Sequence, residues 1–295
     1  MFVTYRSFIL LLPLASSALA NNYFYGITAS GSEGGKNSYT CRTQDDWNAI
    51  AKDTRDQGFH SFRMYTFDCN ALEMASSAAA SQGVKLLAGI YVDGTMAQRS
   101  AKVDQDTQSF INAVRKYGEG RYAGLTVGNE MNDSPQNIIA KVNDVRTRLR
   151  SSGVNTAVST VHTWVAVRDS PVLCSGDFVG ANAHVFFDGQ RTSNQAGDFM
   201  FSTVVPSLKR SCPGKPIMIT ESGWPSRGNN NNAAVASVND ERTALSSLNC
   251  AAKRDPSIQI YAFEHDDQLW KSNDNERSFG IVGKIGLNND ILNAC

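Results

Sequence analysis

The chain has 295 residues, of which 28 are basic and 28 acidic, so its formal net charge is zero. No basic patch stands out, which argues against nucleic acid and anionic membranes as partners. Six cysteines, an even number, favour three disulfides in an oxidising compartment. The 4 histidines are scattered without ligand spacing, so nothing supports a metal site.

The N-terminal residues predict the compartment. Arg6 carries a positive charge, Phe8–Leu14 is largely apolar, and Ala18–Ala20 is a small-residue cleavage site. This order is typical of a secretory signal peptide, residues 1–20, with a short buried helix as the alternative. The apolar run is too short to span a bilayer, and no later segment is long enough. We therefore expect a secreted, extracellular protein whose mature part, residues 21–295, forms one domain.

Short β-branched and aromatic runs alternate with longer segments of helical period along the rest of the chain. Ile138, Val142 and Val145 illustrate the three- and four-residue steps of an amphipathic helix. Ser134 before Pro135 predicts an N-cap and a first helical residue. The expected strands are Tyr23–Thr28, Ser61–Phe67, Lys85–Val92, Tyr122–Asn129, Thr156–Val161, Asp177–Ala183, Pro216–Glu221 and Ile258–Phe263.

Alternation of strand and helix predicts a parallel sheet, and eight such units predict an α/β fold closed into a single (β/α)8 TIM barrel. An open doubly wound sheet is the alternative. It is less favoured because residues 28–35, after the first strand, lack the G-x-G-x-x-G phosphate-binding pattern.

Two of the expected strands end in a glutamate. Leu125–Glu130 reads LTVGNE, and Ile217–Pro225, which contains Glu221, reads IMITESGWP. The two glutamates would lie at the C-terminal tips of the fourth and seventh strands, where barrel enzymes have their active sites. Glycoside cleavage needs two such carboxyl groups: one protonates the leaving oxygen, and the other attacks the anomeric carbon or activates water. A single glutamate here would be an ordinary polar residue, but the matched pair indicates chemistry.

A second pair of carboxylates also follows a strand. Glu264 and Asp266 come after the eighth expected strand and could be a rival acid pair. Because they lie two positions apart on one strand, they cannot flank a bond from opposite faces. Glu130 and Glu221 therefore remain the candidate catalytic pair.

Four segments resemble the motifs of a known family: Val127–Glu130, Asn182–Asp188, Ile219–Pro225, and Trp270-Lys271 followed by Glu276 and Phe279-Gly280. They are similar to those of family 17 glycoside hydrolases, most closely the fungal cell-wall β-1,3-glucanases and β-1,3-glucanosyltransferases. The matches run along nearly the whole mature chain. The resemblance implies a barrel, retention at the anomeric carbon, β-1,3-glucan or laminari-oligosaccharides as substrate, and no cofactor. It also implies Glu130 as acid/base and Glu221 as nucleophile.

Substrate contacts are expected from polar and aromatic residues near the strand tips. Flat rings complement the C–H faces of sugars, Asn129 can bond the hydroxyl beside the reacting carbon, and His184 can orient a carboxylate. Packing within the barrel is an equal alternative for Tyr25, Tyr65 and Tyr91, which also lies at a strand tip. The full expected set is Tyr25, Tyr65, Asn129, His184, Phe187, Asp188, Trp224, Trp270, Lys271 and Glu276.

The segment after Glu130 departs from the family pattern. Residues 131–134 read MNDS, where many fungal members continue with apolar or aromatic residues, so the acceptor preference stays open. The same segment holds the sequon at Asn132, the chain's only one. We expect it to be unused, because Pro135 follows it and the catalytic rim adjoins it.

The order of the elements predicts the disulfide pairing among fifteen possibilities. Cysteines in neighbouring elements are expected to pair, as Cys41–Cys69, Cys174–Cys212 and Cys250–Cys295.

Three classes of function are considered for a barrel with these features. A retaining enzyme, which we expect to be a monomer, uses both carboxylates and transfers as well as hydrolyses, with Phe187 and Asp188 as acceptor platform. A catalytically weak carbohydrate-binding barrel or wall-associated inhibitor would typically have lost one carboxylate. A structural wall protein would need a Ser/Thr-rich or hydrophobic C-terminal tail, whereas the sequence ends at Asn293–Cys295.

Overall fold

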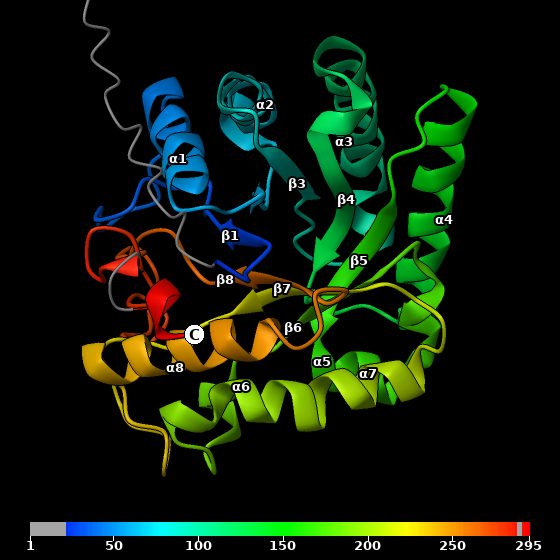
Figure 1. Cartoon of the computed structure of the whole chain (residues 1–295). Coiled ribbons are helices and arrows are strands. Elements are labelled where there is room, and N and C mark those ends of the chain that lie inside the picture. Colours follow the sequence, from blue (N-terminus) through cyan, green and yellow to red (C-terminus); the bar gives the residue numbers. More distant parts are fainter. Residues whose placement is uncertain (1–21, 288–290) are drawn as a thin grey trace, which may run out of the picture.

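The strands form a closed parallel barrel in the computed structural model, which describes residues 22–287 and 291–295 (Figure 1). Neighbouring strands pair in chain order, and β8 returns to β1 with Gly26 opposite Tyr261. This closing pair confirms the predicted barrel and excludes the open doubly wound sheet. The strands are β1 (Gly26–Thr28), β2 (Ser61–Arg63), β3 (Lys85–Ile90), β4 (Tyr122–Asn129), β5 (Val158–Thr163), β6 (Val179–Asn182), β7 (Ile217–Ser222) and β8 (Gln259–Ala262). The predicted signal peptide lies outside the described residues.

Each predicted strand overlaps an observed one; β4 has the predicted bounds, whereas the other seven differ at one or both ends. β1 begins at Gly26 rather than Tyr23, and β2 ends at Arg63 rather than Phe67. β5 ends at Thr163, two residues later than expected. The residues that follow β2 leave the hydrogen-bonded ladder and become a loop at the C-terminal end of the barrel, which is where the site lies.

Seven of the eight strands are followed by helices that cover the outside of the barrel (Figure 1). Thr43 and Thr95 open two of them with capping boxes, in which each threonine accepts a hydrogen bond from a backbone N–H of the first turn. Ser134 accepts from the Asn137 N–H, and Pro135 is the first helical residue, as predicted. The helices are α1 (Gln44–Asp56), α2 (Ala71–Gln82), α3 (Met96–Tyr117), α4 (Pro135–Ser151), α5 (Trp164–Asp169), α6 (Ala196–Phe199), α7 (Val205–Ser211) and α8 (Val238–Ala252).

Two segments depart from a regular strand–helix repeat. A π-helical turn, Met200–Val204, joins α6 to α7 just before Pro206, whose ring lacks an N–H and cannot continue an α-helical ladder. After β8, the described residues form a long irregular loop that runs to Leu287 and then a 3₁₀ turn, η8 (Leu292–Ala294), instead of an α-helix. The end of the chain is held against α8 by the Cys250–Cys295 disulfide.

The lower, N-terminal end of the barrel interior is filled by apolar side chains. Leu87, Phe178, Met218 and Tyr261 form a buried cluster there. Tyr25, which precedes β1, packs on this cluster with its ring 5.7 Å from that of Tyr261. Because this end is closed by packing, a substrate can enter only from the C-terminal end of the strands.

Three disulfides are present, with the predicted pairing: Cys41–Cys69, Cys174–Cys212 and Cys250–Cys295. Among the described residues, no helix combines the length and the apolar character that crossing a membrane requires.

Candidate active site

The C-terminal end of β4 is irregular, and this irregularity positions two site residues. Neighbouring residues of a regular strand point to opposite faces. Here the pairing of β4 with β5 shifts between Thr126 and Asn129, and Gly128 adopts a φ of 78°. Both Asn129 and Glu130 consequently face one cavity. Glu130 itself has a φ of 49°, in the left-handed region that non-glycine residues rarely adopt. Such strain, about 1–3 kcal/mol, gathers at functional sites.

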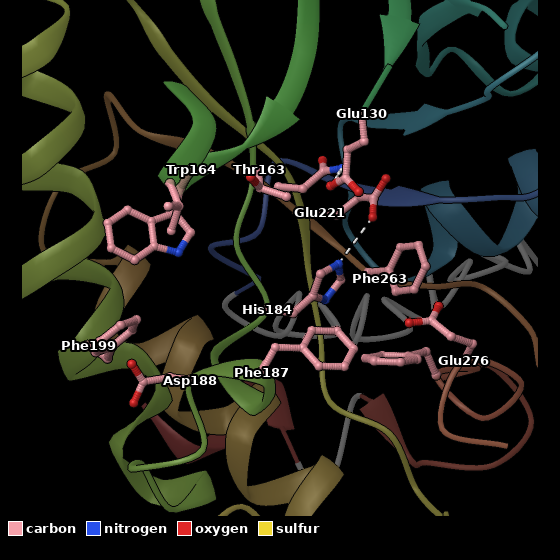
Figure 2. A pocket seen from close by; sticks show the side chains of 13 residues that line it. Glu130, Thr163, Trp164, His184, Phe187, Asp188, Phe199, Glu221, Phe263 and Glu276 are labelled. Atoms are coloured by element: carbon pink, nitrogen blue, oxygen red, sulfur yellow. Dashed lines mark hydrogen bonds and ion pairs between the residues drawn. The ribbon is translucent and has the colours of Figure 1, made fainter. Parts of the chain in front are cut away.

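Glu221, near the end of β7, is held as a carboxylate. Arg63 Nη1 donates to its Oε1 at 2.8 Å. His184 Nε2 lies 3.1 Å from its Oε2 (Figure 2). Burial on its own would raise the pKa of Glu221, but the His184 hydrogen bond and the Arg63 charge lower it to about 2. Because an ionised carboxylate only accepts, His184 must donate from Nε2; its buried Nδ1 has no partner among the described residues.

The surroundings of Glu130 shift its pKa in the opposite direction. Burial and the negative charge of nearby Glu221 raise its pKa, while a hydrogen bond from Asn182 Nδ2 to Oε1, at 2.8 Å, opposes the rise. One carboxyl group is therefore set to stay protonated where its neighbour is ionised. Environments that push two pKa values apart in this way create a proton donor beside a nucleophile or base.

A hydrogen-bond network joins the two glutamates. Arg63 Nη2 donates to Asn129 Oδ1 at 2.7 Å, and Asn182 Nδ2 donates to the same oxygen at 3.2 Å. Thr220 Oγ1 in turn donates to Asn182 Oδ1 at 2.7 Å. These bonds fix the amide of Asn129 beside both carboxyl groups.

Sequence reasoning did not select Arg63 or Asn182 as site residues. The available signal for Arg63 was a charged residue inside a strand whose other residues are uncharged; its side chain is only 1% exposed. Buried charges are paired or serve a function. Asn182 was noticed only within a family motif.

The cavity above the barrel has two halves. Glu130, Glu221, Phe263 and Glu276 line both. The Phe187 half, about 540 Å³, is also lined by Thr163, Trp164, Val165, Asn182, His184, Phe187, Asp188, Phe199 and Phe279 (Figure 2). The Trp270 half, about 480 Å³, is also lined by Ser30, Gly31, Tyr39, Tyr65, Thr66, Asp68, Tyr91, Asn129, Glu264, Trp270 and Lys271. The candidate catalytic pair thus lies where the halves meet.

Most of the predicted contact residues lie in this cavity. The Trp270 half contains Tyr65, Asn129, Trp270 and Lys271, and the Phe187 half contains His184, Phe187 and Asp188. Glu276 borders both. The Trp270 half also contains Tyr91, for which packing was an equal alternative. The lining aromatic residues that sequence reasoning did not select are Tyr39, Trp164, Phe199, Phe263 and Phe279; loops and helix ends that follow different strands bring them together.

Two predicted substrate contacts are wrong. Tyr25 lies at the closed lower end of the barrel, because it precedes β1 rather than following it. Trp224 is 0% exposed: its ring packs on Phe186, and its Nε1 donates to the carbonyl of Val235 at 2.8 Å. Trp224 therefore anchors the loop after β7 and lines neither half of the cavity.

Glu264 lines the Trp270 half without forming a pair with Asp266. Its side chain is 1% exposed, and Lys271 Nζ lies 3.4 Å from Oε1. Burial raises the pKa of Glu264 to about 7, even though the charge of Lys271 opposes the rise. Within residues 22–287 and 291–295, no three His, Cys, Asp or Glu side chains are grouped to hold a metal ion.

Residues 26–280 match the sequence profile of the BtgE/BtgC glycoside hydrolase domain. The chain belongs to this family. Similar proteins include the cell surface mannoprotein MP65 of Candida albicans, 32% identical over 73% of the chain and 55% of the relative. A probable β-glucosidase, btgE, of Aspergillus terreus is 28% identical over 80% of the chain and 41% of the relative. The probable family 17 glucosidase SCW10 of Saccharomyces cerevisiae is 29% identical over 76% and 57%. The chain thus spans about half the length of these relatives.

Solved structures agree with this family. A family 17 β-1,3-glucanosyltransferase from Rhizomucor miehei superposes with a TM-score of 0.74 and 25% identity, covering 89% of this chain and 94% of that one. An active-site mutant of the Rhizomucor miehei enzyme, in complex with laminaritriose, gives a TM-score of 0.73 at 24% identity and covers 88% and 92%. At 24% identity, the second comparison shows only that the two proteins share a fold. The resemblance to family 17 glycoside hydrolases is confirmed.

Proposed function

We propose that this protein is a retaining glycosidase that acts on β-1,3-glucan, with glycosyl transfer beside hydrolysis. The observation that carries the proposal is the pair of carboxyl groups that line one cavity and whose pKa values are moved in opposite directions. Glu130 is the acid/base and Glu221 the nucleophile. Retention requires their carboxyl groups to stand about 5–5.5 Å apart.

The reaction takes two displacements. Ionised Glu221 attacks the anomeric carbon while protonated Glu130 gives its proton to the leaving oxygen, so that the glycosidic bond breaks and a glycosyl ester forms. Glu130, now a carboxylate, takes a proton from water or from a sugar hydroxyl, which attacks the anomeric carbon and releases Glu221. Arg63 and His184 stabilise Glu221 whenever it is ionised.

Asn129 identifies the donor side of the cavity. A hydrogen bond to the 2-hydroxyl of the reacting sugar strengthens in the transition state of such enzymes, and Asn129 lines only the Trp270 half. The donor sugars accordingly bind in the Trp270 half. The leaving group, and later the acceptor, bind in the Phe187 half.

Glycosyl transfer rests on the aromatic lining of the Phe187 half. Phe187 is 51% exposed and offers a flat face to a sugar, with Trp164 and Phe199 further along the same half. An acceptor held in attack geometry gains the advantage of proximity over bulk water. Residues 131–134 contain no aromatic side chain, so we infer that this platform belongs to the segment after β6 and not to the one after β4.

The β-1,3-glucan substrate rests on the relatives: the Rhizomucor miehei neighbour is named as a β-1,3-glucanosyltransferase and was solved with laminaritriose. Secretion to the cell surface or wall rests on relatives such as the mannoprotein and on the three disulfides. A monomer without a cofactor remains our expectation. A catalytically weak carbohydrate-binding barrel is disfavoured, because such a protein has no need of two carboxyl groups with opposed pKa values.

Azide rescue on an aryl β-laminaribioside tests the assignment. We expect Glu221→Ala and Glu130→Ala each to lose at least about a thousandfold in rate. Azide should then give the α-glycosyl azide with Glu221→Ala, by one displacement. With Glu130→Ala it should give the β-azide, because the ester on Glu221 still forms and is opened by a second inversion. Glu73→Ala, on the exposed face of α2, is the matched control. Near-normal rates in Glu221→Ala would contradict the assignment.

A further inference from the structure

Two aromatic side chains of the Trp270 half, Tyr39 and Trp270, come from different loops. Tyr39 belongs to the loop after β1 and Trp270 to the loop after β8, and their rings meet edge to face with centroids 5.2 Å apart. Tyr39 is 45% exposed. Neither residue belongs to a helix or strand, so contacts between the loops must hold these rings in place.

A series of hydrogen bonds connects Trp270 to Arg42, an arginine outside the cavity. Trp270 Nε1 donates to Gln268 Oε1 at 2.9 Å, and Gln268 Nε2 donates to the carbonyl of Asp266 at 3.2 Å. Arg42 Nη2 then donates to Asp266 Oδ1 at 2.5 Å, and Arg42 Nε to the carbonyl of Ser30 at 2.7 Å. Gln268 is 0% and Arg42 5% exposed. Arg42 lines neither half of the cavity.

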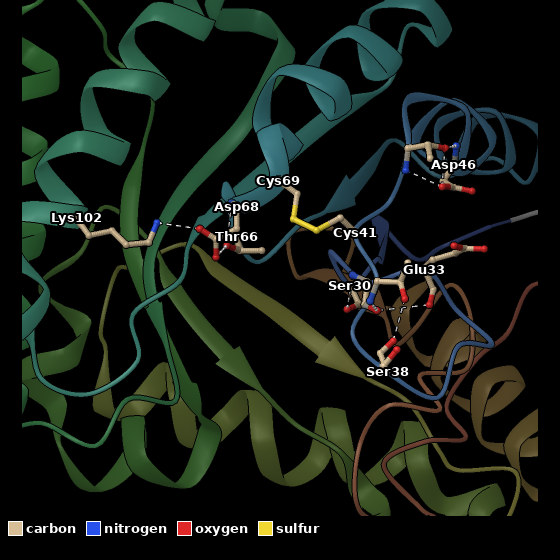
Figure 3. Close-up of a disulfide and its surroundings, with 12 residues drawn as sticks. Ser30, Glu33, Ser38, Cys41, Asp46, Thr66, Asp68, Cys69 and Lys102 are labelled. Carbon is tan, nitrogen blue, oxygen red and sulfur yellow. Dashed lines mark hydrogen bonds and ion pairs between the residues drawn. A yellow bond between two sulfur atoms is a disulfide. The ribbon is translucent and has the colours of Figure 1, made fainter.

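The residue before Arg42 is fixed as well. Cys41 forms a disulfide with Cys69 on the loop after β2, whose Asp68 lines the Trp270 half (Figure 3). Cys41 is therefore attached to the loop after β2, and the adjacent Arg42 is attached to the loop after β8. The Gly35 N–H adds a hydrogen bond to the carbonyl of Asp267, at 3.1 Å. Three of the loops that form the Trp270 half thus meet at residues 41 and 42.

Neighbouring groups favour the ionised form of Asp266, which accepts the hydrogen bond from Arg42. His265 Nδ1 lies 3.3 Å from Asp266 Oδ1, and His265 Nε2 lies 3.0 Å from Asp53 Oδ2 on α1. Although burial opposes ionisation, His265 and Arg42 lower the pKa of Asp266. A carboxylate that accepts from a guanidinium makes stronger, charge-assisted hydrogen bonds.

We infer that Arg42 is a positioning residue for donor binding: through Asp266 and Gln268 it fixes the ring of Trp270 against which a donor sugar stacks. The inference rests on the proposed function, which places the donor in the Trp270 half. Stacking needs a ring plane set in advance, because a ring that must be immobilised on binding costs affinity. The loop after β6 and the acceptor side take no part in this chain.

Kinetics on an aryl β-laminaribioside test the inference, since release of the phenol reports the donor alone. Arg42→Gln and the near-isosteric Gln268→Met should raise KM about five- to tenfold and change kcat less than about twofold. Arg42→Lys, which keeps the charge, should recover part of the loss. With a laminari-oligosaccharide acceptor added, the ratio of transfer to hydrolysis should stay unchanged. Arg121→Gln, which removes an arginine that donates to the carbonyls of Ala79 and Val84 below the barrel, is the control.

A measurement without substrate separates this inference from the proposed function. Acrylamide quenching of Trp270 fluorescence, taken as the difference between each protein and its Trp270→Phe counterpart, should increase in Arg42→Gln and Gln268→Met. Unchanged quenching, or increased quenching with an unchanged KM, would overturn the role of Arg42. A wild-type protein that does not cleave the laminaribioside would overturn the proposed function, while the quenching would still decide whether Arg42 holds Trp270.

Discussion

Arg63 Nη1 lies 2.8 Å from Glu221 Oε1, and both side chains are buried, with 1% and 9% of their surface exposed. The same guanidinium donates to Asn129 Oδ1 and to the carbonyl of Thr220. One cation thus sets the charge of the candidate nucleophile and the orientation of the neighbouring amide. A buried ion pair of this kind is costly to break, because the remaining charge has no compensation.

Arg63→Met should abolish activity and reduce the free energy of unfolding near neutral pH by about 3–5 kcal/mol. In the wild type, the pKa of Glu221 lies at about 2, below its ordinary 4.5, so Glu221 contributes stability above pH 4.5 that is lost as the pH falls toward 2. Without Arg63, burial raises the pKa of Glu221, and protonation then relieves the unpaired charge. The stability difference between the two proteins should therefore shrink as the pH falls through the raised pKa that Glu221 has in the folded variant.

Denaturant unfolding of both proteins between pH 4 and 8 provides the measurement. Arg63→Lys, which keeps a cation near Glu221, serves as the control and should lose less stability. A difference that stays constant across this pH range would show that Arg63 acts through packing alone.

Glu221→Gln should lower the pKa of Glu130. Burial first, and the charge of Glu221 second, raise that pKa in the wild type, and this substitution removes only the charge. Titration of the Glu130 carboxyl carbon by NMR in both proteins gives the comparison, with Glu73→Gln as a distant control. A raised or unchanged pKa in Glu221→Gln would mean that the two carboxyl groups are not electrostatically coupled.

Asn182→Ala should shift the alkaline limb of the kcat/KM profile to higher pH. Asn182 donates to Glu130 and thereby favours its ionised form, so removing the donor raises the pKa of Glu130 further. The acid form required for the first step then persists to higher pH. The maximal rate should fall about tenfold, because Asn129 also loses a hydrogen bond. A limb that moves to lower pH would refute this role for Asn182.

Phe187→Ala should reduce transfer more than hydrolysis. Loss of the exposed ring weakens stacking of an acceptor sugar, while the donor half and both carboxyl groups remain intact. Chromatography of products from a laminari-oligosaccharide, at low and high concentration, should show products longer than the donor only at high concentration in the wild type. Their share should fall about threefold or more in the variant.

Val235→Ala is the matched control for Phe187→Ala, since Val235 is 40% exposed and lines neither half. Equal transfer in Phe187→Ala and the wild type would remove Phe187 from the acceptor site. Only shorter products from the wild type, at every concentration, would leave a hydrolase without transfer.

The local pattern of the sequence was sufficient to predict the barrel, its eight strands and the disulfide pairing, because each depends on short-range periodicity and on the order of the elements. It also placed Glu130 and Glu221 at strand tips, since the end of an apolar run is visible in one dimension. Trp224 shows the limit of this reasoning: its position after a strand tip suggested a sugar contact, but packing against Phe186 buries it.

Only the tertiary structure decided which side chains meet. Arg63 and Glu221 are 158 positions apart, and Arg42 and Asp266 are 224 apart, so no local pattern relates either pair. Their contacts, and the opposed pKa values of the two glutamates, follow from burial and from charges contributed by β2, β4, β6 and β7 together. Burial and electrostatic coupling are properties of three-dimensional distance; the sequence supplies the groups, and closure of the barrel sets how strongly they interact.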